Sequence, residues 1–211
     1  MVPATDGRLA RGERARAGIL AKAADIASAE GLEGLSIGRL AQECGTSKSN
    51  VAAHFGSKAQ LQLAAVRYAT DVFMREVVSP ALKARRGLPR LLAIYECWCD
   101  YSRRRVFSGG CFFAAVVAEY DARDGAVRDV LRQFRTASLG FQTRLVAEAQ
   151  QAGEICADAD PAQIAFELDA FTLGANSQAV LFDDSTAYQR ATVAIAARIE
   201  SVKPGRKQCD A

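Results

Sequence analysis

The stretch from Ser36 to Lys58 limits the fold more than any other part of the 211-residue chain. Its first part has apolar residues at positions i, i+3, i+4 and i+7, which is one stripe of a short amphipathic helix. These residues are Ile37, Leu40, Ala41 and Cys44. Ser36 stands at the N-cap position, and Gly45 stands where a helix commonly ends in a residue with positive φ. The pattern therefore predicts a short helix that ends at a turn.

A second short helix is predicted directly after this turn. Thr46 and Ser47 can cap it, and between Lys48 and Phe55 only Val51 and Phe55 are suited to burial. Two short helices joined by a turn of about three residues that contains glycine form a helix-turn-helix. The outward face of the second helix offers small and polar side chains, which suits entry into a DNA major groove. These side chains are Lys48, Ser49, Asn50 and His54, with Ala52 and Ala53 between them.

The run TSKSNVAAHFGSKAQL, residues 46–61, resembles the DNA-binding signature of the TetR family of one-component transcriptional regulators. The shared marks are a small polar turn, a Val or Leu in mid-helix, His-Phe at its end, and a Gly/Pro-Ser-Lys start to the next helix. The resemblance covers about Arg11 to Val66, and the length and helical pattern of the remainder fit it. The chain departs from the family at Ala52 and Ala53, where many members carry aromatic residues that touch phosphate or a thymine methyl.

The resemblance implies a homodimer that places this helix of each subunit in successive major grooves of a roughly palindromic operator, about 34–36 Å apart. Base contacts are expected from Lys48, Ser49 and Asn50, and phosphate contacts from residues around them. The expected DNA-binding residues are Arg16, Ser36, Thr46, Ser47, Lys48, Ser49, Asn50, Ala53, His54 and Lys58. A structural, partly buried role is the alternative for His54.

The pattern of the whole chain predicts an all-α fold of about nine helices. Aromatic residues make up only 8% of the chain while hydrophobic residues make up 50%, and no strand alternation follows Gly87. Helices are expected over residues 12–30, 37–44, 48–55, 57–80, 88–104, 111–120, 125–152, 161–182 and 186–202. Residues 1–10 are expected to be disordered.

Three functional segments are predicted: a helix-turn-helix DNA-binding domain over residues 1–56, a helical effector-binding and dimerisation domain over 57–202, and a polar tail over 203–211. The first three helices bury too little apolar surface to be stable alone, so they should pack against the helices that follow them. The helix that begins at Ser57 runs from the DNA site into the second domain, so its tilt can couple the two. Lys58 lies in its first turn, where helix amides favour an anion such as phosphate.

An apolar pocket for a small-molecule effector is implied by the resemblance, and several stripes can line it. The candidates are Tyr95, Trp98, Cys99, Tyr101, Phe112, Phe113, Phe134, Phe141 and Phe171. The alternative for every one of them is ordinary core. An effector of such a pocket should be apolar or aromatic.

The helix over residues 161–182 is apolar on more than one face, so it must pack on more than its own subunit. The resemblance implies that the last two helices pair with their mates in a four-helix bundle. Candidate interface residues are Ile164, Leu168, Phe171, Ala175, Ala179, Phe182, Tyr188, Ala191, Ile195 and Ile199.

The net charge of +3 does not by itself indicate a DNA-binding protein. Four arginines fall between Arg8 and Arg16, where a basic arm could touch phosphate or the minor groove. A solvated, frayed terminus is the alternative. Arg103–Arg105 are interpreted as a solvated helix end.

Constellations typical of enzymes are missing from the sequence. The only histidine is His54, in the predicted recognition helix, and no phosphate-binding glycine loop or metal-ligand cluster appears. We therefore expect no enzyme activity, cofactor or metal. Glu119, Asp121 and Asp124 are interpreted as surface caps at a helix end.

The six cysteines are interpreted as reduced thiols that act as small hydrophobes. A redox sensor at Cys97, Cys99 or Cys111 is the alternative. No run of ~20 apolar residues and no secretory signal is seen, so a cytoplasmic location is expected.

A second hypothesis comes from a different class. The chain could be an all-helical small-molecule or protein-binding module whose helix-turn-helix is vestigial. Loss of specific DNA binding on replacing Lys48 and Asn50 by Ala distinguishes the first hypothesis from this one.

Overall fold

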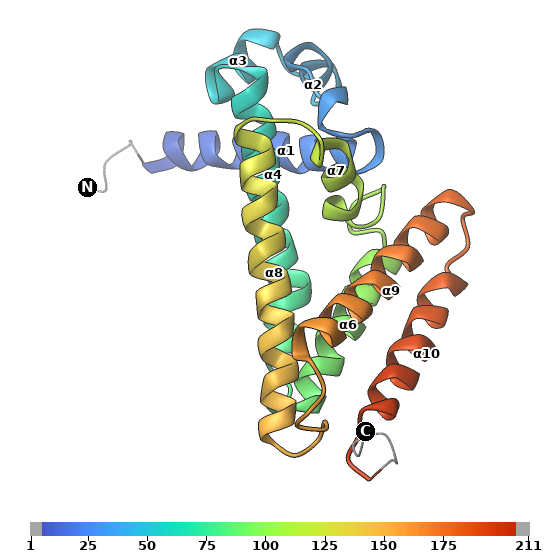
Figure 1. Ribbon diagram of the computed structural model, residues 1–211. Helices are drawn as coiled ribbons and strands as arrows, with labels where there is room; N and C mark the ends of the chain where they lie inside the picture. Colours follow the sequence, from blue (N-terminus) through green and yellow to red (C-terminus); the bar gives the residue numbers. More distant parts are fainter. Residues whose placement is uncertain (1–5, 206–211) are drawn as a thin grey trace. The chain divides into compact units, whose positions relative to one another are not determined.

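The computed structural model describes residues 6–205, with side chains from residue 12 onward, and all regular structure in that range is helical (Figure 1). This confirms the all-α fold class. The α-helices are α1 (Asp6–Glu30), α2 (Ile37–Glu43), α3 (Lys48–Phe55), α4 (Lys58–Phe73), α5 (Ser79–Ala81), α6 (Leu88–Arg103), α7 (Phe112–Tyr120), α8 (Ala126–Gln151), α9 (Pro161–Leu181) and α10 (Thr186–Ser201). A 3-10 turn, η1 (Leu32–Gly34), and a π turn, η2 (Met74–Val78), complete them.

From Leu88 onward, every predicted helix agrees with the observed one to within one residue at each end. The N-terminal prediction needs correction, because α1 begins at Asp6 and residues 6–10 are helical. The expected disorder of residues 1–5 and the end of the predicted tail, 206–211, lie outside the described residues.

The helix expected over residues 57–80 is interrupted. It is regular to Phe73 and then widens into η2, where the Ser79 N–H bonds the carbonyl of Met74, five residues back. A proline ring in a regular α-helix clashes with the carbonyl four residues before it and leaves that carbonyl without a donor. Pro80 lies two residues after the end of η2. The wide turn therefore covers the residues whose carbonyl would clash with the Pro80 ring in a regular α-helix.

The first of two compact units consists of the described residues up to Asp71 together with Phe107–Leu131. In it α1 packs against η1, α2 and α7. The small core predicted for the first three helices is confirmed, with only Ile37 half-buried. Its buried members are Leu32, Leu35, Leu40, Val51 and Phe55. Because α7 comes from the middle of the chain, this unit is completed by a segment distant in sequence.

The loop before α7 lies directly against the backbone of α1. The Ser108 N–H donates to Asp25 Oδ1 (2.7 Å), and the Gly109 N–H donates to Ser28 Oγ (3.0 Å). A Cβ atom added to Gly109 would lie 1.9 Å from the carbonyl oxygen of Ser28. Glycine is therefore required here for the two backbones to approach.

The second compact unit consists of Val72–Val106 and the described residues from Arg132 onward. Here α9 and α10 form an antiparallel hairpin (Figure 1), and α6 packs against both of them and against η2 and α5. The largest fully buried side chains of the hairpin are Ile164, Leu168 and Tyr188. α4 and α8 each contribute residues to both units.

This grouping by contact differs from the division that the sequence places at residue 56, since α7 groups with α1. The predicted division concerns function and stays a prediction. Among the described residues, no helix is both long enough and apolar enough to cross a membrane.

Candidate nucleic-acid interface

The predicted helix-turn-helix is present, and its caps explain its bounds. Ser36 Oγ accepts from the Arg39 N–H at 3.1 Å and so caps α2. At the other end of α2, the N–H groups of Gly45 and Thr46 bond the carbonyls of Gln42 and Ala41. This pair of bonds is a Schellman motif, and Gly45 adopts the positive φ of 61° that the motif needs. The turn geometry is thus set by local sequence.

The start of α3 is also capped locally. Ser47 Oγ accepts from the Asn50 N–H at 3.1 Å and shares a second hydrogen bond with Ser49 Oγ at 2.9 Å. The Asn50 side-chain amide donates to Thr46 Oγ1 at 2.8 Å. These short polar side chains therefore hold one another in place at the tip of the helix.

Only Val51 and Phe55 of α3 are buried, as the sequence predicts. Lys48, Ser49, Asn50 and Ala53 are exposed, and Ala52 and His54 are half-buried. Lys48 reaches across α2, since a Cβ atom on Gly38 would lie 3.1 Å from its Cε. No aspartate or glutamate occurs between residues 44 and 58. The outward face of α3 is therefore small, polar and free of negative charge.

Two further predicted contact residues, Arg16 and His54, lie beside Phe55. The guanidinium of Arg16, an exposed side chain of α1, lies 5.3 Å from the centre of the Phe55 ring. The His54 ring lies 6.1 Å from the same ring. Arg16 thus lies beside the recognition helix, whereas the side chains of Arg8 and Arg11 lie outside those described.

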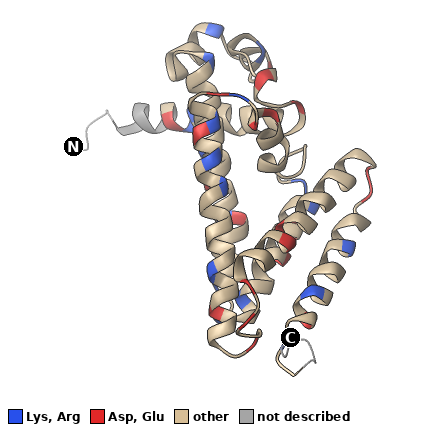
Figure 2. Ribbon diagram, viewed as in Figure 1, with Lys and Arg blue, Asp and Glu red and all other residues tan. Residues whose placement is uncertain are grey.

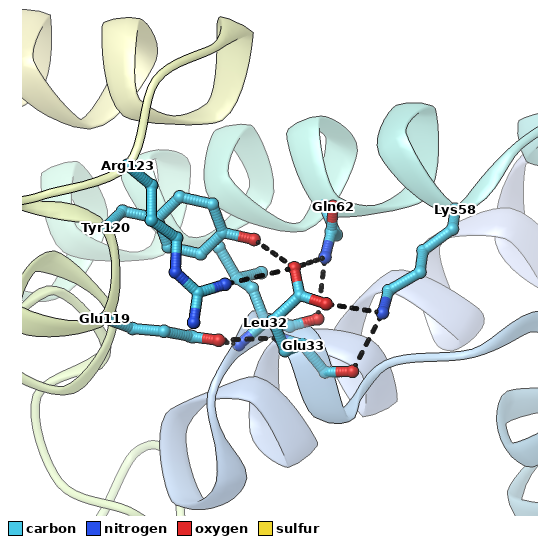
Figure 3. Close-up of polar contacts among 7 residues, drawn as sticks. All are labelled: Leu32, Glu33, Lys58, Gln62, Glu119, Tyr120 and Arg123. Atoms are coloured by element: carbon cyan, nitrogen blue, oxygen red, sulfur yellow. Dashed lines mark hydrogen bonds and ion pairs between the residues drawn. The ribbon is translucent and has the colours of Figure 1, made fainter.

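Lys58, the remaining predicted phosphate contact, is held by a carboxylate (Figure 3). Its ammonium donates to Glu33 Oε2 at 2.8 Å and to the Glu33 carbonyl oxygen at 3.0 Å. Glu33 Oε1 accepts from the Tyr120 hydroxyl at 2.9 Å and from the Gln62 side-chain amide at 3.3 Å. The hydrogen bonds from Lys58 and Tyr120 lower the pKa of Glu33 to about 2, so this carboxylate is charged at neutral pH.

The neighbouring Glu119 does not act as a surface cap of its own helix, and that interpretation needs correction. Its carboxylate accepts from the backbone N–H groups of Leu32 (2.7 Å) and Glu33 (2.9 Å), which lie 87 and 86 residues away in the sequence. A carboxylate from α7 therefore caps the N-terminal end of η1. Nothing local in the sequence signals this pairing.

The residues proposed as an effector pocket do not all fall in one compact unit. Phe112 and Phe113 belong to the first unit and pack on each other at 5.3 Å. The other seven, Tyr95, Trp98, Cys99, Tyr101, Phe134, Phe141 and Phe171, belong to the second. The first four of these are buried, while Phe134, Phe141 and Phe171 are half-buried.

A polar cluster that the sequence did not predict lies among these aromatic residues. Asp169 of α9 is buried and accepts from both terminal nitrogens of Arg135 of α8, at 2.6 and 3.1 Å. The Gln142 amide lies 3.5 Å from the same carboxylate, and its oxygen accepts from the Tyr95 hydroxyl at 2.7 Å. Burial and the Asp169 charge raise the pKa of Tyr95, which keeps it a donor. The second unit therefore contains a largely buried ion pair.

Replacing Asp169 by Ala should destabilise the fold by about 1–3 kcal/mol, because the guanidinium of Arg135 would lose its carboxylate in a largely buried place. Chemical denaturation monitored by circular dichroism measures the change. Asp100→Ala is the matched control, since Asp100 pairs with Arg103 and Arg104 at the surface and should cost less than ~1 kcal/mol. Equal losses in both variants would contradict the prediction.

Most of the residues predicted for the dimer interface lie inside their own subunit. Ile164, Leu168, Ala175, Ala179, Tyr188, Ala191, Ile195 and Ile199 are all buried within one chain. Phe171 is half-buried and Phe182 is exposed. The stripes identified from the sequence are thus the face that joins α9 to α10 and α6. The exposed apolar residues of the hairpin are the predicted Phe182 and four that the sequence did not predict: Phe166, Val180, Leu181 and Val193.

Three of the described cysteines have thiols that burial makes less reactive. Burial raises the pKa of Cys99 to about 11 and also raises the pKa values of Cys44 and Cys97, which disfavours the reactive thiolate. Cys156 is disulfide-bonded, so the interpretation of all six as reduced thiols is wrong for this residue. Within the described range, no group of His, Cys, Asp and Glu side chains could hold a metal ion.

Comparison with protein families matches both parts of the chain. Residues 19–65 match the family of bacterial regulatory proteins of the tetR type. Residues 87–195, about half of the chain, match the tetracyclin repressor-like C-terminal domain. A comparison with curated proteins finds no match.

Solved structures share the fold over nearly the whole chain. A TetR transcriptional regulator from Chloroflexus aurantiacus is 24% identical, with a TM-score of 0.84 over 91% of this chain and 97% of that one. A TetR-family regulator from Streptomyces coelicolor is 24% identical, with a TM-score of 0.77 over 90% and 96%. AibR, crystallised with isovaleryl coenzyme A and operator DNA, is 21% identical, with a TM-score of 0.69 over 90% and 98%.

Proposed function

Because this chain belongs to the TetR family of bacterial transcriptional regulators, we propose that it is a homodimeric repressor that a small-molecule effector releases from its operator. Members of the family are non-enzymatic DNA-binding transcription factors, and the DNA-binding role holds for this chain as a member. The repressor role, the effector and the cytoplasmic location are our inferences.

The observation that carries the DNA-binding assignment is the outward face of α3. It combines exposed Lys48, Ser49 and Asn50 with no acidic side chain from residue 44 to residue 58. Lysine, serine and asparagine are side chains that read base edges in the major groove. Arg16, Thr46 and His54 flank this face and are proposed to contact phosphate.

We infer that the second subunit packs on the exposed apolar residues of the α9–α10 hairpin. Leu181 and Phe182 are 74% and 70% exposed, and Phe166 is 63% exposed. No lysine or arginine lies on α9 (Figure 2), so α9 itself would bring no positive charge into the interface. Large exposed apolar side chains on one hairpin favour an interaction surface. This set replaces the buried stripes as our proposed interface.

Leu181→Glu should therefore shift the protein from dimer to monomer, because a dimer would have to bury the new charge. Sedimentation velocity measures the shift. Leu82→Glu is the matched control, since Leu82 is also exposed, at 43%, but lies outside the hairpin. A dimer that survives Leu181→Glu, or dissociates equally in both variants, would contradict the proposed interface.

The effector is proposed to bind in the second unit, which combines aromatic and ionic side chains. Phe73 lies 6.0 Å from Tyr101 and 5.4 Å from Phe134, ring centre to ring centre, and contributes an aromatic residue that the sequence analysis missed. The Arg135–Asp169 pair and Gln142 supply polar partners. We therefore propose an effector with an apolar body and one polar group, which adds a polar group to the apolar or aromatic molecule expected from the stripes. Such a ligand would act by binding one of two conformations more tightly.

The deciding experiment is a titration of the purified protein into the DNA that flanks its own gene, at two salt concentrations, beside a random duplex of equal length. The repressor hypothesis expects one flanking segment to be bound far more tightly than the random duplex. Equal and strongly salt-dependent binding to both would reflect only phosphate attraction. That result would favour the alternative of a binding module with a vestigial helix-turn-helix.

A further inference from the structure

We propose that Glu33 is a restraining residue that holds Lys58 away from DNA phosphate and so lowers the affinity of the protein for DNA. The inference rests on the proposed function, since it concerns how tightly the DNA-binding unit engages its operator. It assigns a role to a residue outside the helix-turn-helix, in the 3-10 turn between α1 and α2.

The ammonium of Lys58 is already hydrogen-bonded to Glu33 (Figure 3). Two hydrogen bonds run from its ammonium to Glu33, one to the carboxylate and one to the backbone carbonyl of the same residue. An ammonium has three donors, so two of the three are taken. Lys58 remains 44% exposed, and a phosphate can therefore reach it only in competition with Glu33.

Glu33 is itself fixed from several directions, which distinguishes it from an ordinary surface carboxylate. The Tyr120 hydroxyl donates to it, and the Arg123 guanidinium lies 3.5 Å from the same oxygen. Glu119 fixes its backbone N–H from α7, and the Gln62 amide of α4 bonds the carbonyl of Leu32 beside it at 2.9 Å. A carboxylate held in place gives its ion pair a lower entropy cost than a pair of two mobile side chains.

The two carboxylates of this cluster, Glu33 and Glu119, have different partners. In this cluster two cations, Lys58 and Arg123, face two carboxylates, Glu33 and Glu119. Glu119 binds backbone N–H groups, whereas Glu33 binds the ammonium. Removing the charge of Glu33 should therefore release Lys58, while removing that of Glu119 should not.

The test is a double-mutant cycle on DNA affinity at one fixed salt concentration. Glu33→Gln should raise the affinity by about two- to fivefold, the range that exposed ion pairs commonly control. In a Lys58→Met background the same substitution should have no effect, because the released ammonium is absent. A gain that persists in the Lys58→Met background would overturn the proposal, since it would arise from the general loss of a negative charge.

Glu119→Gln is the charge-matched control. It removes one negative charge from the same cluster, and the amide oxygen of the new side chain can still accept from the Glu33 N–H. Glu33 should therefore keep its place beside the ammonium, and the DNA affinity should stay near that of the unsubstituted protein. An equal rise in Glu33→Gln and Glu119→Gln would also overturn the proposal. Should Glu33→Gln lose its helical circular dichroism signal, Glu33→Asp takes its place, because it keeps the charge but shortens the reach. Glu33→Asp should then raise the DNA affinity, and only when Lys58 is present. An unchanged affinity would overturn the proposal.

The cycle is run on the flanking DNA and on the random duplex, because phosphate contacts carry no sequence information. The effect of Glu33 is expected on both. Equal binding of the unsubstituted protein to both DNAs would overturn the proposed function and leave the effect of Glu33 measurable. A clear preference for the flanking DNA with no Lys58-dependent effect of Glu33 would retain the function and reject this inference.

Discussion

The double substitution Lys48→Ala and Asn50→Ala is expected to remove specific DNA binding while leaving the fold intact. Both side chains are exposed on α3, and the buried residues that anchor this helix, Val51 and Phe55, are untouched. Removing one base contact should cost about 1–3 kcal/mol, so the affinity of the double variant for the specific site should fall by about thirtyfold or more. Fluorescence anisotropy with the flanking DNA and a random duplex measures the decrease.

Lys83→Ala is the control for this experiment, because it removes one exposed positive charge from outside the first unit. It should lower neither the affinity nor the preference for the flanking DNA appreciably. The double variant should keep the helical signal and thermal stability of the original protein. If it still prefers the flanking DNA as strongly as before, the assignment of base contacts to Lys48 and Asn50 is wrong.

Gly109→Ala is expected to give the largest loss of stability among the single substitutions considered. The new Cβ atom would lie 1.9 Å from the carbonyl oxygen and 2.2 Å from the carbonyl carbon of Ser28, which are backbone atoms of α1. Neither backbone can move aside as a flexible side chain would, so the loop and α1 must separate. We expect a loss of about 3 kcal/mol, at the upper end of the range for overpacked sites, measurable by thermal and denaturant unfolding.

Gly18→Ala is the matched control within the same unit. Gly18 lies inside α1, and a Cβ atom there meets nothing within 4 Å. Replacing glycine by alanine in a helix interior with open space should stabilise the protein by about 0.5–1 kcal/mol. The two glycine substitutions should therefore shift the unfolding midpoint in opposite directions. A Gly109→Ala variant as stable as the original would show that the approach of the loop to α1 is not required.

The helix-turn-helix could be predicted closely because its determinants are local. Ser36 and Ser47 cap helices whose N–H groups lie three residues away, and Gly45 closes a turn of a few residues. Periodicity likewise located the later helices, since each buries a long stripe. Contacts between distant positions could not be predicted in this way: the pairings of Glu33 with Tyr120 and of Glu119 with Leu32 each span 87 residues.

The dimer surface illustrates a different limit. A stripe of apolar residues shows that a helix has a buried face but not which neighbour buries it. On α9 the regular stripe through Ile164 and Leu168 packs within the subunit. The exposed Phe166 and Leu181 fall off that stripe and gave no periodic signal of their own. For the same reason, the buried charge of Asp169 was hidden inside an apolar segment.

The position of α7 has a consequence for how DNA specificity can be exchanged between relatives. The chain builds most of the first unit before Asp71, leaves it, and returns at Phe107 to complete it. A gene fragment that stops at α4 therefore encodes an unfinished module, with the α7-facing surface of α1 left without its cover. Recombination that transplants only the N-terminal segment would bring together an α1 and an α7 from different lineages. The contact that must be preserved is the one between Ser28 and Gly109. The unit that can be exchanged is therefore encoded by two separate segments of the gene, although the helix that reads DNA is encoded by one.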